Sequence, residues 1–220
     1  MVIKKIIKKP YNILKLYGTD IQNIFKYGLK APLFAETIFV NPRDVSSALT
    51  LKTSSNSINV RKLSGSVISD KTFNKFKEVP LAEWPKFKYC IDHWIYGKSW
   101  EEAGAYKFMD ELIKERGRVD NCSSMDDVYL RYKKLDKIFE KIKSEQYFPT
   151  RKELNKNKFR EQQGVLIHIG PNGEPYASGG AHRFAIAYVL NLTFPAQLGM
   201  VHKDGLRKLD QYRRSRLIKM

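Results

Sequence analysis

The sequence predicts an α/β fold of the α+β kind, and three observations predict it. Residues 36–45 alternate apolar and polar side chains and are rich in β-branched residues, which is typical of a strand. Residues 123–148 show the 3.6-residue period of an amphipathic helix. Residues 165–202 predict a hairpin, a glycine turn, a helix and a further strand in succession. With 220 residues, of which 42% are apolar, the chain can bury one sizeable core or two small ones.

The first strand, ETIFVNPRDV, is expected to end at the turn formers Asn41-Pro42. The Ser/Thr-rich run at 46–71 fits either a hairpin or a long loop, and the pattern favours neither. Two helical stretches are predicted within 86–117, around Gly97 and Gly104.

The clearest helix is predicted within 123–148. Ser123 or Ser124 can cap its first turn, and the two aspartates at 126 and 127 suit the positive end of the helix dipole. The predicted apolar face consists of Val128, Leu135, Ile138, Phe139 and Ile142. We expect this helix to run to about Glu145.

The last third of the chain predicts a hairpin with arms at 165–169 and 175–177 and a turn at 171–173. The sequence GGAHRFAIAYVLNL follows as a helix of about three turns, and TFPAQLGMVH as a strand.

The chain is strongly basic. Its 40 Lys and Arg against 23 Asp and Glu give a formal charge of +17 and a pI near 9.7. This balance favours contact with phosphates, nucleic acid or an anionic membrane, and a generally basic solvated surface is the plain alternative.

The expected location is the cytoplasm. Cys90 and Cys122 have no metal-ligand or redox spacing, no apolar run approaches the roughly 18 residues that span a bilayer, and no secretory signal is present. Residues 1–30 interleave lysines with Ile, Leu and Val, which predicts either peripheral contact with a membrane or packing against the chain's own domain.

The stretch SGGAHRFAIA, residues 178–187, is the main candidate site. The first N–H groups of a helix lack partners and carry about half a positive charge, so they attract anions. Gly179 and Gly180 allow the backbone to approach a phosphate closely, and Arg183 can clamp it, while His182 can donate a hydrogen bond or act as an acid. The alternative is a plain tight turn in which Arg183 pairs with a carboxylate such as Glu174.

These residues resemble the second conserved box of the ParB/sulfiredoxin-like superfamily, in which Gly-x-x-Arg or Gly-x-His-Arg opens a helix. Upstream, VNPRD at 40–44 and IKSEQYFPTRKEL at 142–154 are similar to two further elements of that family, in the same order. The resemblance implies a core of a small mixed sheet with helices over 36–205, carrying a mainly helical insertion at about 50–122. It leaves 1–35 as a basic amphipathic segment and 206–220 as a basic tail. The chain also looks like ParB-like proteins of surface-polysaccharide gene neighbourhoods, a likeness that supplies no reaction.

The resemblance also implies a nucleotide site for ATP or CTP. The residues that match the family's phosphate turn are Ser178, Gly179, Gly180, His182 and Arg183, with Arg43 as a second cationic contact. Ala181 stands where sulfiredoxins have their reactive cysteine, so sulfiredoxin chemistry is not expected. A chromosome-partition role is doubtful because no helix-turn-helix pattern follows. His168, His182 and His202 lack a metal spacing that would favour a nuclease.

Two functions remain open at this stage. The first is an ATP-dependent kinase that uses Mg²⁺ and transfers phosphate to a small-molecule or glycan hydroxyl, with catalytic candidates Glu101, Glu102, Glu145 and His182. The second is a nucleotide-gated module that contacts nucleic acid or a membrane-associated partner through basic termini. The basic cluster of the C-terminal tail comprises Arg213, Arg214, Arg216 and Lys219.

Overall fold

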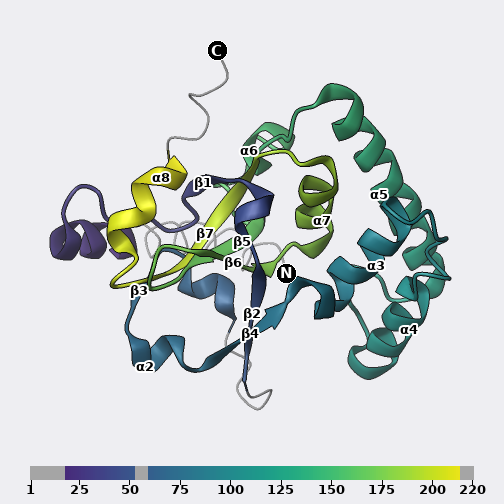
Figure 1. The fold of residues 1–220 in the computed structure, drawn as a ribbon, viewed down its shortest axis with the longest axis horizontal. Helices are drawn as coiled ribbons and strands as arrows, with labels where there is room; N and C mark the ends of the chain where they lie inside the picture. Colours follow the sequence, from purple (N-terminus) through teal and green to yellow (C-terminus); the bar gives the residue numbers. More distant parts are fainter. Residues whose placement is uncertain (1–17, 53–58, 214–220) are drawn as a thin grey trace, which may run out of the picture.

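The computed structural model describes residues 18–52 and 59–213 of the chain (Figure 1). Its centre is a mixed seven-stranded sheet with the order β1-β7-β5-β6-β2-β4, and β3 pairs with β7 outside this path. The strands are β1 (Thr37–Val40), β2 (Ser47–Leu51), β3 (Val67–Ile68), β4 (Phe76–Pro80), β5 (Val165–Ile169), β6 (Pro175–Gly179) and β7 (Phe194–His202). The pairs β5–β7 and β2–β6 are parallel. The pairs β1–β7, β2–β4 and β5–β6 are antiparallel, and the last of these is a hairpin.

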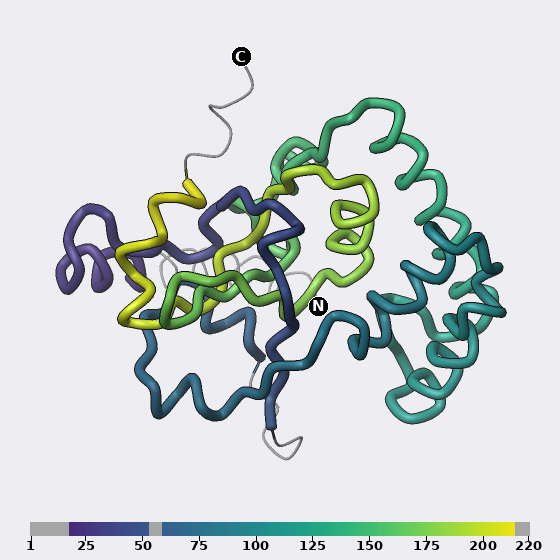
Figure 2. Tube along the Cα trace, viewed as in Figure 1, coloured from purple at the N-terminus to yellow at the C-terminus, as the bar shows by residue number. Residues whose placement is uncertain are grey.

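Helices gather mainly on one side of the sheet, where α7 packs against it and α3, α4 and α5 form an outer layer (Figures 1 and 2). The described helices are residues 18–27, α2 (Asp70–Phe73), α3 (Pro85–Trp94), α4 (Ala105–Arg116), α5 (Met125–Glu145), α6 (Arg151–Leu154), α7 (Ala181–Leu190) and α8 (Leu209–Arg213). Short 3₁₀ turns are η1 (Pro42–Asp44), η2 (Val60–Leu63), η3 (Leu81–Glu83) and η4 (Leu206–Lys208).

One large apolar core joins the sheet to these helices. Phe184 of α7, Tyr132 of α5 and Phe194 of β7 are all fully buried within it. A smaller cluster, built on Leu49, Phe76 and Met200, is separate from this core. Because α7 is apolar on nearly all sides, it sits between the sheet and the outer helices, and its N-terminus is held at a fixed position.

The predicted α+β class is confirmed, and the strongly patterned elements form where the sequence predicts them. The long helix begins after Ser124, whose side chain accepts a hydrogen bond from the Asp127 N–H, and it ends at Glu145. The hairpin, the helix after the glycines and the final strand appear as β5, β6, α7 and β7. The Ser/Thr-rich run forms β2 and β3, which lie apart in the sheet and do not pair as a hairpin.

The segment at 50–122 is not simply a helical insertion. Besides α3 and α4 it supplies β4, which pairs with β2, and β3, which pairs with β7. Both strands belong to the main sheet, so this segment and the predicted core fold as one body around a shared interior.

The boundaries predicted for the two ends of the chain also differ from those in the structure. Residues 209 and 212 of the expected tail are buried, and α8 lies beside β1. Arg213, expected among the ligand-binding cations of the tail, is held by Glu36, with 3.0 Å between Nη2 and Oε2, and by Asp210. The other three cations of that cluster lie outside the described residues, as do positions 1–17 of the basic N-terminal segment.

Within the described parts of the chain, no helix has the length and apolarity needed to cross a membrane.

Candidate anion-binding cleft

The glycine turn at the start of α7 opens onto a cleft of about 900 Å³. The cleft lies between this turn, η2, the start of α3, the loop before α5, α5 itself and the start of α6. Its lining residues are Arg61, Trp84, Lys86, Arg118, Asp120, Asn121, Arg131, Leu135, Arg151, Gln163, Ser178, Gly179, Gly180, Ala181, His182 and Arg183. Six of these are Arg or Lys, and among the described residues one carboxylate, Asp120, lines the cleft with them.

The backbone of the turn requires glycine at position 180. Gly180 caps α7 with a φ of +77°, a left-handed conformation that side chains disfavour. A Cβ at Gly180 would lie 2.9 Å from the Cα of Val165. A Cβ at Gly179 would lie 3.1 Å from an Nη atom of Arg61. Gly179 therefore lets the Arg61 guanidinium approach the start of α7 closely, and Gly180 allows the turn its left-handed backbone.

Arg183 is largely withdrawn from solvent at one wall of the cleft. Its Nη2 donates to the Pro149 carbonyl at 2.7 Å, and its guanidinium stacks on the ring of Phe148 at 4.6 Å. Burial lowers the pKa of Arg183 to about 10, against the opposing influence of Glu161, so the side chain stays charged at neutral pH. The acid whose charge acts on Arg183 is Glu161, whereas Glu174, named in the plain-turn alternative, accepts from the Tyr176 hydroxyl.

Three of the cleft arginines keep unused donors. The Nε atoms of Arg131, Arg151 and Arg183 are buried and have no hydrogen-bond partner among the described residues. Buried donors without partners are rare in folded proteins and call for a physical reason such as a bound ion. A polyanion in the cleft would provide acceptors on several sides at once.

Arg61 reaches the cleft from η2. Its Nη1 donates to Gln197 Oε1 at 2.8 Å, and the same oxygen accepts the Gln163 N–H at 2.9 Å. Burial and then the nearby charge of Arg151 lower the pKa of Arg61. The mutual repulsion of these two arginines is a cost that an anion between them would remove.

Asp120 stands on a tight turn at the cleft edge. It and Asn121 have φ values of +52° and +70°, and Val119 bridges Cys122 across them. Lys86 Nζ lies 2.5 Å from Asp120 Oδ2, and Arg131 Nη2 lies 3.6 Å from that oxygen. Burial alone would raise the pKa of Asp120, but these two cations outweigh it and the pKa is lowered. The carboxylate is therefore ionised at neutral pH.

His182 lies at the inner end of a buried hydrogen-bond chain. The Tyr132 hydroxyl donates to the Tyr89 hydroxyl at 2.6 Å, and Tyr89 lies 2.8 Å from His182 Nε2. Burial, and then the charges of Lys86 and Arg131, lower the pKa of His182 to about 3. A neutral ring that accepts at Nε2 carries its proton on Nδ1. His182 can thus donate a hydrogen bond, whereas its low pKa disfavours a role as a cationic acid.

The structure brings together only part of the predicted site. Gly179, Gly180, His182 and Arg183 line the cleft, and so does Ser178, although its hydroxyl already donates to the Leu49 carbonyl at 3.0 Å. Arg43 does not line the cleft. It contacts Tyr188 and Asn191 at the opposite end of α7.

The predicted catalytic acids also lie outside the cleft lining. Glu101 and Glu102 are exposed in the connection between α3 and α4, where Glu102 accepts hydrogen bonds from the backbone and hydroxyl of Ser99. Glu145 is exposed at the end of α5 and pairs with Lys141. The expected roles of these three acids gain no geometric support.

The cleft residues that the sequence did not indicate come from distant segments. They are Arg61, Lys86, Arg118, Asp120, Arg131 and Arg151. One local signal was available, because Arg151 opens a short helix capped by Thr150 and Glu153. The others stand among many solvated cations, and only the tertiary fold brings them together.

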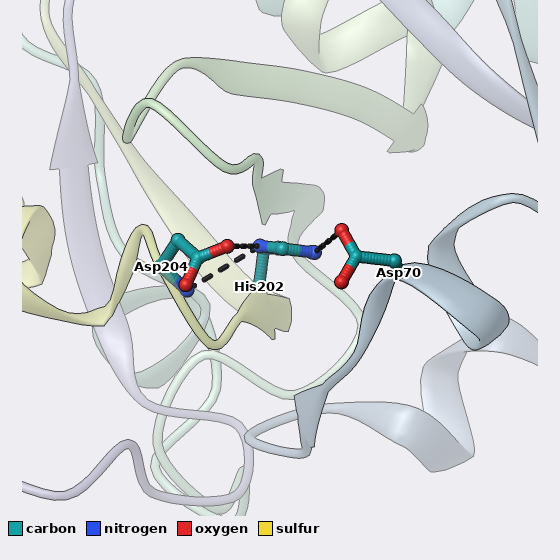
Figure 3. A group of neighbouring side chains, drawn as sticks. All are labelled: Asp70, His202 and Asp204. Carbon is teal, nitrogen blue, oxygen red and sulfur yellow. Dashed lines mark hydrogen bonds and ion pairs between the residues drawn. The ribbon is translucent and has the colours of Figure 1, made fainter.

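A second polar cluster lies elsewhere, at the end of β7. His202 is fully buried, with Asp70 Oδ1 3.2 Å from its Nε2 and Asp204 Oδ2 3.5 Å from its Nδ1. Figure 3 shows the two aspartates on opposite sides of the ring. One ligand atom from each of these three residues lies within 4.8 Å of the others, close enough to surround a metal ion, but Lys203 already lies 2.8 Å from Asp70 and Figure 3 shows no shared centre for the two carboxylates. The cluster fits a polar contact that holds α2 to β7.

Comparison with known proteins found no matching family model, no similar curated protein and no similar solved structure.

Proposed function

We propose that the cleft binds the phosphate chain of a nucleoside triphosphate, ATP or CTP. The observation that carries the proposal is the gathering of six cationic side chains around the N-terminus of α7, three of them with buried donors that find no partner in the described part of the chain. Helix N-terminus, glycine turn and guanidinium groups are each suited to phosphate oxygens. The resemblance to the ParB/sulfiredoxin-like superfamily, which rests on the same turn, implies the same class of ligand.

The cleft also supports a preference for several phosphates over one. Its cations approach from separate elements, with Arg61 on η2, Lys86 on α3 and Arg151 on α6. A single phosphate has too few oxygens to satisfy donors on every side, whereas a triphosphate extends across them. Trp84 in the cleft lining offers an aromatic surface for a base or sugar.

The reaction that fits this site best is phosphoryl transfer to a hydroxyl of a small molecule or glycan. Mg²⁺, when bound with a nucleotide, neutralises charge on the phosphate oxygens. Mg²⁺ sites of this kind need only one or two carboxylates besides phosphate, and ionised Asp120 supplies one. In this proposal Asp120 would hold the metal, Arg183 and Arg151 would hold phosphate oxygens, and His182 would donate a hydrogen bond to the substrate.

One observation favours a nucleotide-gated module without catalysis as the second candidate. Asp120 is already neutralised by Lys86 and Arg131, which leaves the described cleft without a free base. A polyanion that draws η2, α3 and α6 toward α7 would act as a switch, since it links elements whose cationic side chains otherwise repel one another.

Calorimetry of the full-length protein with ATP, CTP and inorganic triphosphate, each with Mg²⁺, tests the binding. We expect Arg151→Ala and Arg183→Ala to weaken binding by tenfold or more, because a charged hydrogen bond to phosphate contributes about 1.5–3 kcal/mol. Arg43→Ala is the matched control, since it removes a cation at the far end of the same helix and should leave affinity unchanged.

Equal affinity in Arg151→Ala, Arg183→Ala and the wild type, with normal melting curves, would place the nucleotide elsewhere. Incubation with labelled ATP and pooled sugar or cell-wall metabolites then separates the two functions. A kinase consumes ATP only when the acceptor is present, and Asp120→Asn abolishes that turnover. A gated module binds the nucleotide with no acceptor-dependent consumption.

A further inference from the structure

The helix at 18–27 packs against the rest of the molecule in an unusual way. Surface helices normally bury an apolar stripe and expose a polar one. Here, besides the half-buried Ile24 and Tyr27, the inward side makes several polar contacts. Asp20 is buried, lies 2.8 Å from Arg160 Nη2 and accepts the Phe34 N–H at 2.7 Å. Asn23 donates to the carbonyls of Pro32 and Gly65.

The outward surface of this helix and the turn after it exposes three large apolar side chains. Ile21 and Phe25, one helical turn apart, are 55% and 90% exposed, and Leu29 is 92% exposed. We call these three residues the N-terminal apolar face. Large apolar side chains left this open next to one another are typical of a surface that binds something.

The charge around this face indicates the chemistry of its partner. Lys26 and Lys30 are exposed beside it, although Lys30 also pairs with Asp210. Asp20 is the one acid among residues 1–30, and it is buried. The preceding residues of the sequence add Lys4, Lys5, Lys8, Lys9 and Lys15 without an acid. Apolar side chains combined with an excess of lysine match the interface of an anionic lipid bilayer.

A second copy of this chain is a poorer partner, because pairing two such faces would bring the same lysines together. The position of the face also suits a surface-bound protein. It lies at one end of the molecule, whereas α3, α4 and α5 lie at the other (Figures 1 and 2). The cleft, which α3 and α5 help to line, is therefore left open when this end rests on a membrane.

We propose that the N-terminal apolar face, together with the exposed Lys26 and Lys30 beside it, docks the protein on an anionic membrane surface. The proposal does not depend on the nucleotide cleft.

Sedimentation of the full-length protein with lipid vesicles tests the docking. We expect binding to vesicles of phosphatidylglycerol mixed with phosphatidylcholine and much weaker binding to phosphatidylcholine alone. The double variant Phe25→Asp/Leu29→Asp should bind at least about tenfold more weakly, because it replaces two inserting side chains by charges. Leu130→Asp is the matched control, since this leucine is 69% exposed on α5 and should not matter.

Near-UV circular dichroism confirms that each variant is folded. Two results would overturn the proposal. One is equal binding of the double variant and the wild type to anionic vesicles. The other is that the wild type does not bind vesicles at all. If light scattering then shows a dimer that the double variant breaks, the face would be assigned to a second copy of the chain.

Discussion

Glu161 does not line the cleft, but it interacts with two of the arginines that do, Arg151 and Arg183. The residue is fully buried, its Oε2 accepts the Arg151 N–H at 2.8 Å, and its Oε1 has no hydrogen-bond partner among the described residues. Burial raises the pKa of Glu161 to about 7, although the Arg151 N–H and the charges of Arg183 and Arg151 oppose the shift. Near neutral pH this carboxyl is therefore only partly ionised.

This shift predicts a pH dependence of stability. Between the ordinary pKa of 4.5 and the folded value of about 7, the unfolded chain has lost the proton and the folded chain still holds it. The folded state then binds more protons, so the free energy of unfolding falls as pH rises through this window, by at most about 3 kcal/mol. We expect Glu161→Gln to remove this decrease while keeping an acceptor for Arg151.

Urea unfolding of both proteins across this pH window measures the difference. Glu140→Gln, a change at an exposed glutamate of α5, serves as the control and should follow the wild type. Parallel pH profiles for Glu161→Gln and the wild type would show that Glu161 titrates normally.

At the level of single residues, the sequence predicted those cleft residues that lie close to one another along the chain. Gly180 and Arg183 belong to one turn and one helix start, so their proximity follows from backbone geometry alone. Arg61 and Lys86 reach the same cleft through the order of strands and the packing of α3, which no short-range pattern contains. The position of Arg43 could not be predicted for the same reason, because the sequence around a cation beside a strand does not indicate which end of α7 that cation will contact.

Among the helices and strands, the sequence predicted correctly those that have a strong local pattern. The helix α5 has a capping box and a regular apolar stripe, and the β5–β6 hairpin has Pro171-Asn172-Gly173 at its turn. The strand β4 has the sequence FKEVP, in which two charged residues interrupt the alternation. It lies at the edge of the sheet, where only one neighbour is needed and polar side chains are tolerated.

The outer helices are joined by one carboxylate. Asp136 on α5 accepts hydrogen bonds from the indole N–H groups of Trp94 and Trp100, at 3.1 and 3.0 Å, and lies 3.1 Å from His93 Nε2. It thus ties α3 and the loop before α4 to α5. Because Trp100 is buried, loss of the acceptor would leave its N–H without a partner.

We predict that Asp136→Ala destabilises the protein by about 2 kcal/mol, the cost of leaving the buried Trp100 N–H unsatisfied. Glu140→Ala, four residues further along α5, removes only a surface contact 3.9 Å from Lys143 and should change stability by less than about 0.5 kcal/mol. Thermal and urea unfolding give both values. Equal small losses in the two variants would mean that the aromatic cluster holds the helices without this carboxylate.

In the whole molecule, the sequence carries an overall excess of positive charge, and part of that charge is concentrated in the cleft. The formal charge of +17 makes any anion mildly stabilising through screening, whereas the cleft gathers six cations around one cavity. These cations come from η2, α3, the loop before α5, α5, α6 and α7, so their repulsion acts between elements that build the tertiary fold. A ligand that bridges them is expected to stabilise the molecule as a unit.

We therefore predict that inorganic triphosphate raises the melting temperature by roughly 5–10 °C at about a hundred times its dissociation constant, equivalent to about 2.7 kcal/mol. Hydrogen exchange should slow together at η2, the start of α3, the start of α6 and the glycine turn, because one ligand bridges all four. Sodium chloride at equal ionic strength is the control for screening, and the double variant Arg151→Ala/Arg183→Ala is the control for the cleft. If sodium chloride gives the same rise, or if the double variant responds as the wild type does, the stabilisation arises from general charge screening and the cleft is not the site.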